Sequence, residues 1–202
     1  MKDLKQIFSK TYTREYFSRN KNLIILSLII FIGSIIIGAV FNKSFEAIVT
    51  EIIRQMLNEI SMESVSENAV SIFVNNITAN LVILAGGIIF SLLSVFAIIV
   101  NGILIGYVYT LTTPLIFLVG TVPHGIFEIT ALILSLTGAF IITKTELLCI
   151  QALFAGNLSS QVENMKICFK DIIFTIVVSF VLLVFAAIIE AAVTPLLLSM
   201  VV

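Results

Sequence analysis

ITANLVILAGGIIFSLLSVFAIIVNGILIGYVYTLTTPLIFLV, residues 77–119, is the stretch that decides how this chain folds. It contains no charged residue. As a single helix it would be about 64 Å long, roughly twice the hydrocarbon thickness of a bilayer. We therefore expect two membrane spans, 77–100 and 103–119, joined by a tight turn at Asn101 and Gly102.

The composition of the 202-residue chain also places it in a membrane. Hydrophobic residues make up 59% of the chain and charged residues 11%, whereas a soluble domain carries about a quarter charged residues. The core of a 202-residue chain cannot bury so much apolar surface, so the excess must face lipid. The net charge of −1 gives no surplus that would favour nucleic acid as a partner. One His and two Cys exclude a disulfide framework and the usual Cys-rich or His-rich metal motifs.

Three further apolar stretches are long enough to span the bilayer, namely 23–41, 126–143 and 172–193. The expected fold is therefore all-α, a polytopic helical membrane protein with five transmembrane helices. Lys and Arg favour cytoplasmic loops, and nine of the eleven lie before the first span or within 144–171. Four crossings separate these two segments and return them to one side. We expect a multi-pass protein of the cell membrane with a cytoplasmic N-terminus and an external C-terminus.

Two amphipathic segments lie outside the spans. Residues 1–22 place most apolar side chains on one helical face, which predicts a cytoplasmic interfacial helix on anionic lipid. Residues 44–67 repeat apolar side chains at i, i+3, i+4 and i+7, which predicts an external amphipathic helix. Its polar face carries the acidic docking candidates Glu46, Glu51 and Glu59. We expect its apolar stripe to pack on the spans, on a second copy of the chain, or on another protein.

Ionisable side chains inside a membrane span are costly, and this chain has three to explain. His124 and Glu128 are four residues apart and share one face of the fourth span. Glu190 lies about 27 Å along the last span from its inner start, which gives it the same outer depth. Asn76 and Asn80, at the outer start of the second span, complete the expected polar cluster.

The chemistry of this cluster has three interpretations. It can be a hydrogen-bonded network that fixes the second, fourth and fifth spans, a site for protons or ions, or a thin metal site of one imidazole and two carboxylates. The spacing H-x-x-x-E differs from the H-E-x-x-H of zinc peptidases, and no hydrolase constellation is evident. We therefore expect no enzyme activity, no metal and no cofactor.

Four sequence features resemble the stage II sporulation protein M family. They are PHGIFEI at 123–129, the Asn pair at 75–76, Asn101 with Gly102, and IEAAVTP at 189–195. The resemblance implies a membrane protein of five or six spans. The family's namesake is similar to a membrane scaffold that holds two cell-wall hydrolases, an amidase and a lytic transglycosylase, at the engulfing septum. The shared polar positions of the family fall here on Asn76, Asn101, His124, Gly125, Glu128 and Glu190.

Two functions from different classes follow from these observations. The first is a non-enzymatic membrane scaffold whose partners are the lipid bilayer, other membrane or envelope proteins, and a second copy of the chain. The rival is a transporter or channel component that uses His124, Glu128 and Glu190 for ions or protons, with an intramembrane hydrolase a distant third. Gly102 and Gly106 form G-x-x-x-G, which predicts close helix packing.

Overall fold

The computed structural model describes residues 7–59, 65–156 and 158–201. In these ranges the chain is helical and contains no strand, as the all-α prediction requires. The helices are α2 (Lys10–Arg19), α3 (Lys21–Val40), α4 (Asn42–Glu59), α5 (Val65–Ala85), a 3-10 turn (Gly86–Ile89), α6 (Leu92–Leu111), α7 (Pro114–Ala155), α8 (Leu158–Ala192) and α9 (Thr194–Leu198).

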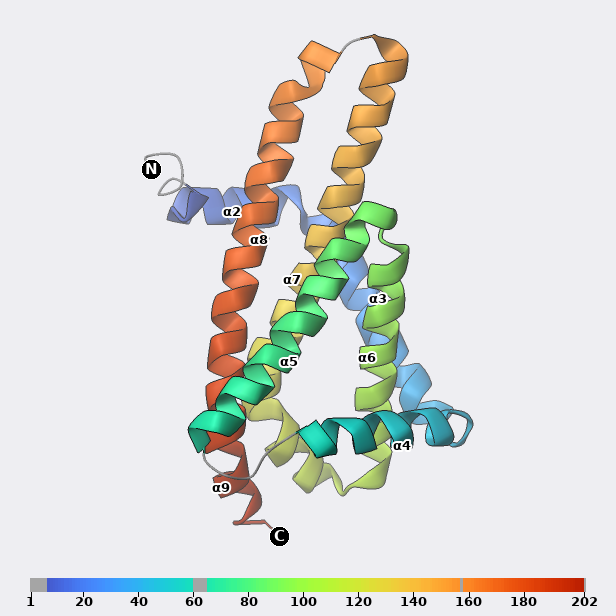
Figure 1. Cartoon of the computed structure of the whole chain (residues 1–202), viewed down its shortest axis with the longest axis vertical. Helices are drawn as coiled ribbons and strands as arrows, with labels where there is room; N and C mark the ends of the chain where they lie inside the picture. The colour runs from blue at the N-terminus through green and yellow to red at the C-terminus, as the bar shows by residue number, and fades with distance from the viewer. Residues whose placement is uncertain (1–6, 60–64, 157, 202) are drawn as a thin grey trace.

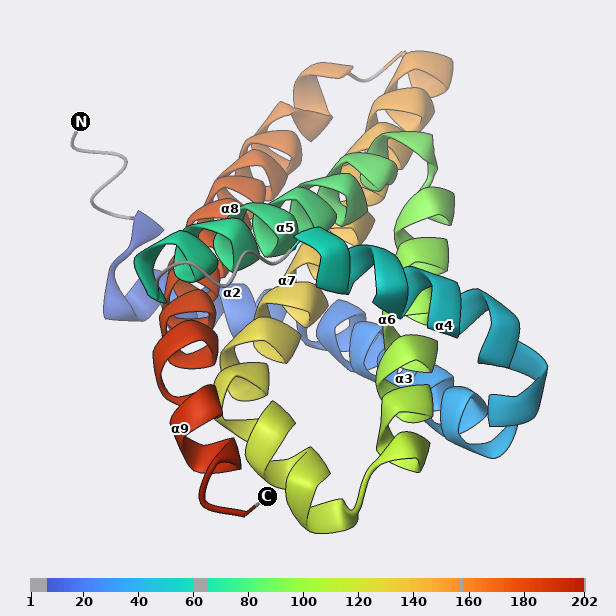
Figure 2. The same ribbon diagram turned by 60° about the horizontal axis from the view of Figure 1, so that its bottom comes forward.

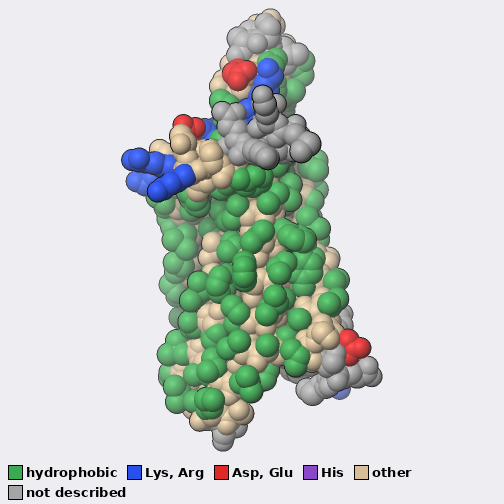
Figure 3. Space-filling view, turned by 90° about the vertical axis from the view of Figure 1, so that its left-hand side faces the viewer, with side chains coloured by type: hydrophobic (Ala, Val, Ile, Leu, Met, Phe, Trp, Pro, Cys, Tyr) green, Lys and Arg blue, Asp and Glu red, His purple; other side chains and the backbone are tan. Residues whose placement is uncertain are grey.

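Five of these helices, α3, α5, α6, α7 and α8, are long and apolar enough to cross a membrane, which confirms the expected number of spans. They form one bundle (Figure 1), with α2 and the α7–α8 connection toward one end and α4 and α9 at the other. We call these the α2 end and the α4 end. Figure 3 shows hydrophobic side chains covering the bundle between the ends, with the charged side chains gathered at the ends.

The turn between the second and third spans lies at 86–91, so the expected turn at Asn101 and Gly102 is wrong. Phe90 and Ser91 adopt left-handed backbone conformations with φ of 50° and 59°. The hydroxyl of Thr143 donates a 3.1 Å hydrogen bond to the Gly87 carbonyl and so ties this turn to α7. The expected spans 77–100 and 103–119 are thereby replaced by α5 with its 3-10 turn, α6, and the start of α7.

Asn101 and Gly102 lie inside α6, where the Asn101 amide finds a hydrogen-bond acceptor and Gly102 packs against a neighbouring helix. The side-chain amide of Asn101 donates to the Ala97 carbonyl of its own helix at 2.9 Å. Gly102 and Gly106 instead let α3 approach closely. A Cβ at Gly102 would lie 2.6 Å from the Ser34 hydroxyl oxygen. The G-x-x-x-G motif is therefore a packing site between two helices of the same chain.

The central element is α7, in which every residue from 131 to 139 is buried. It begins with Thr113 as N-cap and Pro114 in its first turn, twelve residues before the expected span 126–143. Pro123 removes a backbone donor inside the helix, and α7 changes direction near its lower end (Figures 1 and 2). Gly156, with φ of 64°, ends the helix.

The segment 144–171, which separates the expected fourth and fifth spans, is mostly helical. α7 continues to Ala155, and α8 starts at Leu158, fourteen residues before the expected span 172–193. Together they form a helical hairpin that extends beyond the other spans at the α2 end (Figure 1).

The two amphipathic helices lie across the bundle ends rather than along it (Figures 1 and 2). The expected outer helix 44–67 is α4, although 60–64 lie outside the described residues and 65–67 begin α5. In α4, Val49 is buried whereas Ile48 is 64% exposed. Within the expected segment 1–22, α2 rests on α8, and Tyr16 is fully buried in protein instead of facing lipid.

We expect Gly38→Ala to destabilise the protein by about 1 to 3 kcal/mol, because its Cβ would meet the backbone of Ile103 in α6. Gly33→Ala is the matched control in the same helix, since no atom lies within 4 Å of its Cβ. It should leave stability unchanged or raise it by up to about 1 kcal/mol. Thermal unfolding in detergent measures both. Equal effects would show that α3 and α6 are not in close contact.

Candidate functional site

Two sequence motifs that are about seventy residues apart meet at the α4 end. His124, directly after Pro123, belongs to α7, and Thr194 begins α9. The Nδ1 atom of His124 lies 3.3 Å from the Thr194 hydroxyl, which in turn donates to the Ile189 carbonyl at 3.4 Å. The strings PHGIFEI and IEAAVTP therefore build one site.

Three ionisable side chains converge in this site. One ligand atom from each of His124, Glu128 and Glu190 lies within 4.8 Å of the others. His124 is 9% exposed, and the two glutamates are partly buried. The rings of Phe127 and Phe185, 6.0 Å apart, pack α7 against α8 beside them. Two carboxylates and one imidazole form a set of N and O donors that suits a proton or a metal cation.

Only one hydrogen bond of the expected network is found among the side chains of His124, Glu128 and Glu190 and the other described residues. Among the described residues, His124 bonds to Thr194, while neither Glu128 nor Glu190 accepts a hydrogen bond. The carboxylates therefore do not connect the spans through hydrogen bonds. They leave acceptor capacity for a proton, a cation or a partner group.

The asparagines expected in this cluster lie elsewhere. Asn80 accepts a 2.8 Å hydrogen bond from Ser135, two helical turns beyond Glu128 along α7, and donates to the Asn76 carbonyl at 2.9 Å. Asn101, which was expected at a turn between spans and not in this cluster, is in the middle of α6.

The remaining candidate site residues are also separate from the three ionisable groups. Gly125 faces an apolar cavity of about 400 Å³ between α3, α6 and α7. The docking candidates Glu46 and Glu51 are exposed on α4, and the side chain of Glu59 lies outside the described residues.

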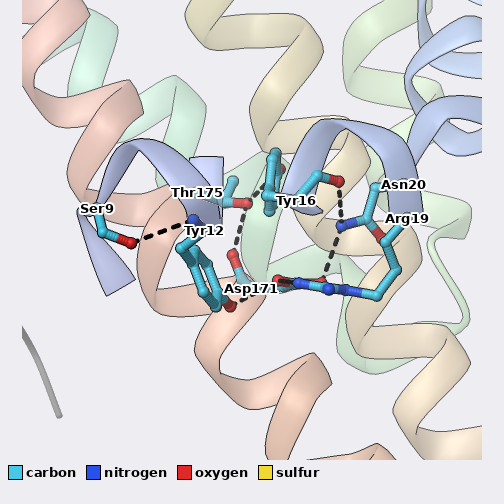
Figure 4. Close-up of polar contacts among 7 residues, drawn as sticks. All are labelled: Ser9, Tyr12, Tyr16, Arg19, Asn20, Asp171 and Thr175. Carbon is cyan, nitrogen blue, oxygen red and sulfur yellow. Dashed lines mark hydrogen bonds and ion pairs between the residues drawn. The ribbon is translucent and has the colours of Figure 1, made fainter. Parts of the chain in front are cut away.

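Sequence reasoning missed a second polar centre, at the α2 end (Figure 4). The carboxylate of Asp171 on α8 is 2% exposed and accepts hydrogen bonds from three side chains of the N-terminal segment. Tyr12 donates at 2.7 Å, Arg19 donates two bonds at 2.7 and 3.0 Å, and Asn20 donates at 2.9 Å.

Tyr16 extends this centre toward the membrane. Its hydroxyl lies 2.8 Å from that of Thr175, which donates to the Asp171 carbonyl at 2.9 Å. Burial raises the pKa of Tyr16 to about 12. Burial and the Asp171 hydrogen bond raise the pKa of Tyr12 above its ordinary value, and the Asp171 hydrogen bond raises that of Arg19. Both tyrosines therefore stay protonated, and Asp171 is neutralised by Arg19.

A faint sequence signal for this centre exists. Tyr12, Tyr16 and Arg19 are spaced four and three residues apart on one face of α2, and Asp171 and Thr175 have the same four-residue spacing on α8. Each half alone reads as an amphipathic face. Only the fold joins them.

The five apolar helices and their buried polar centres define a multi-pass helical membrane protein. A model of one family, described as stage II sporulation protein M, matches residues 27–195. The chain belongs to this family, as its motifs predicted. Neither the curated proteins nor the solved structures contain a match to it.

The carboxylates of Glu128 and Glu190 should add nothing to folding, because they accept no hydrogen bond among the described residues. We expect Glu128→Leu and Glu190→Leu to unfold within about 1 kcal/mol of the parent protein, or above it. Thr194→Val removes the partner of His124 and should cost about 1 kcal/mol. Thr130→Leu, on the exposed face of α7, is the control. Strong destabilisation by both Leu variants in thermal unfolding would restore a structural role.

Proposed function

We propose that the protein is a non-enzymatic scaffold that assembles other membrane or envelope proteins. The family match supports a membrane protein of this kind, and the resemblance to the namesake favours cell-wall hydrolases as partners. The observation that carries the proposal is α4, which lies across the bundle end with one face packed and the other exposed (Figure 2).

The packed and exposed faces of α4 differ in chemistry. Val49 anchors the helix on the bundle, whereas Ile48 and the acidic Glu46 and Glu51 face away. Lys43 and Arg54 are exposed on α4 as well, so this helix presents charges of both signs, and a protein partner can place basic groups against Glu46 and Glu51.

We also propose that the α4 end is external. Basic residues of α2 and of the α7–α8 hairpin lie together at the opposite end, and such residues favour the cytoplasm. The exposed face of α4 then meets partners outside the cell membrane, where cell-wall hydrolases act.

A photo-crosslinker placed at Ile48 should capture an envelope partner, because this side chain is 64% exposed on the docking face. Glu46→Lys combined with Glu51→Lys should reduce the crosslinked yield at least about tenfold, since reversed charge repels a basic contact. Glu163→Lys is the control, because Glu163 is exposed on the hairpin at the other end. Undiminished crosslinking in the double variant, with unchanged thermal stability, would contradict docking through this face.

Cysteine labelling tests the orientation. In a chain with Cys149→Ala and Cys168→Ala, Ser44→Cys should react with an impermeant maleimide in intact cells, because Ser44 is exposed on α4. Glu163→Cys should react only after the membrane is permeabilised. The reverse pattern would invert the topology.

A second candidate function is proton or cation handling, as part of a transporter or channel. One observation favours it: His124, Glu128 and Glu190 converge, and neither carboxylate accepts a hydrogen bond from any residue that the structure describes. Glu128→Gln and Glu190→Gln separate the two functions, because each removes a charge while keeping the shape. A scaffold retains its partner in both variants. A transporter reconstituted in vesicles loses ion flux in both.

A further inference from the structure

We propose that a pocket at the α2 end binds the phosphate group of an anionic membrane lipid. The pocket has a volume of about 240 Å³ and lies where α2, α7 and α8 meet. Arg19 comes from α2, Lys144 and Leu148 from α7, and Asn164 and Asp171 from α8. This inference does not depend on the scaffold proposal or on the orientation, because both leaflets carry lipid phosphates.

The charges around the pocket favour an anion. Asp171 is already neutralised by Arg19 and accepts further hydrogen bonds from Tyr12 and Asn20 (Figure 4). Lys144 forms no ion pair with any part of the chain that the structure describes, so it leaves a positive charge at the pocket wall. Among the residues that line the pocket, the charge of Asp171 is therefore balanced by Arg19, and the charge of Lys144 remains unbalanced.

The donors around the pocket suit phosphate oxygens. Arg19 uses its Nε and Nη2 atoms on Asp171, which leaves Nη1 to donate elsewhere. The amide of Asn164 gives one hydrogen to Gln161 at 2.9 Å and retains a second. A guanidinium, an ammonium and an amide from three helices therefore surround a space that a phosphate can occupy.

A second pocket on the other side of Arg19 fits a phosphate less well. It has a volume of about 290 Å³ and is lined by Arg19 and Lys170, but also by Glu15. Glu15 forms no ion pair with any of the described residues. A carboxylate facing the space repels an anion, so we assign the phosphate to the pocket that holds Lys144.

The depth of the pocket favours a lipid over free phosphate. Arg19 lies two residues before the first membrane span begins at Lys21, which is the level of lipid headgroups. Leu148 and Ile167 give the pocket an apolar side, and Phe17 and Phe169 are exposed at the same end of the bundle. A lipid can place its phosphate among the donors and its glycerol and acyl carbons against these apolar groups.

Thermal unfolding in detergent with short-chain lipids tests the proposal. Phosphatidylglycerol should raise the melting temperature of the parent protein, whereas zwitterionic phosphatidylcholine should not. Lys144→Gln should weaken the phosphatidylglycerol response about fivefold in half-saturating concentration. Asn164→Asp should weaken it further, because it replaces a donor with a negative charge. Both side chains are exposed, so each variant should melt like the parent without lipid.

Lys166→Gln is the matched control, because Lys166 is exposed on α8 and pairs with Glu163 at 3.5 Å outside this pocket. It should keep the parent response to phosphatidylglycerol. An equal loss in Lys166→Gln would show diffuse attraction to charge, and an equal response to phosphatidylcholine would show no selection for an anionic lipid. A full response to millimolar inorganic phosphate would make free phosphate the ligand. Each of these three results overturns the proposal.

Discussion

The absence of water in the bilayer core is the constraint on which the rest of this structure depends. Each polar group within a span must find its partner inside the chain. Ser27, Ser34 and Asn101 meet this demand by donating to carbonyls one turn earlier in their own helices. Helices that satisfy themselves in this way can then pack through glycines, as α3 and α6 do at Gly102 and Gly106. Other polar groups bond across helices inside the bundle, as Ser135 does to Asn80, and the two clusters of ionisable side chains described above lie at the bundle ends.

The same constraint explains what the sequence could and could not predict. The number of spans follows from hydropathy and length, and the meeting of His124, Glu128 and Glu190 follows from helical spacing and depth. The turn at 86–91 was missed because Asn-Gly marks turns in water, whereas the Asn101 amide is satisfied within its helix. The Asp171 centre was missed because Tyr12 is 159 residues away, and hydropathy does not distinguish a face that meets lipid from one that meets protein.

The two polar centres lie on α7 and α8 but differ in kind. At the α2 end, Asp171 accepts hydrogen bonds from three side chains and its charge is matched by Arg19, so its own bonding capacity is filled. Removing Arg19 would leave the buried charge of Asp171 unpaired, so this centre strongly favours the contact between α2 and α8. At the α4 end, Glu128 and Glu190 keep free acceptors among the described residues. Polar groups that contribute little to folding are retained where they serve a function.

The two bundle ends also differ in how their helices are connected. Hydrogen bonds to Asp171 fix the N-terminal segment to α8 (Figure 4), and the long α7–α8 hairpin extends beyond them (Figure 1). The α4 end is built from a kinked helix, a break at Val193 and a helix that lies flat across the bundle. Pro123 and the break at Val193 lie directly beside His124 and Thr194, whose hydrogen bond joins α7 to α9. A substitution or ligand that removes this hydrogen bond therefore acts on the connection between α7 and α9.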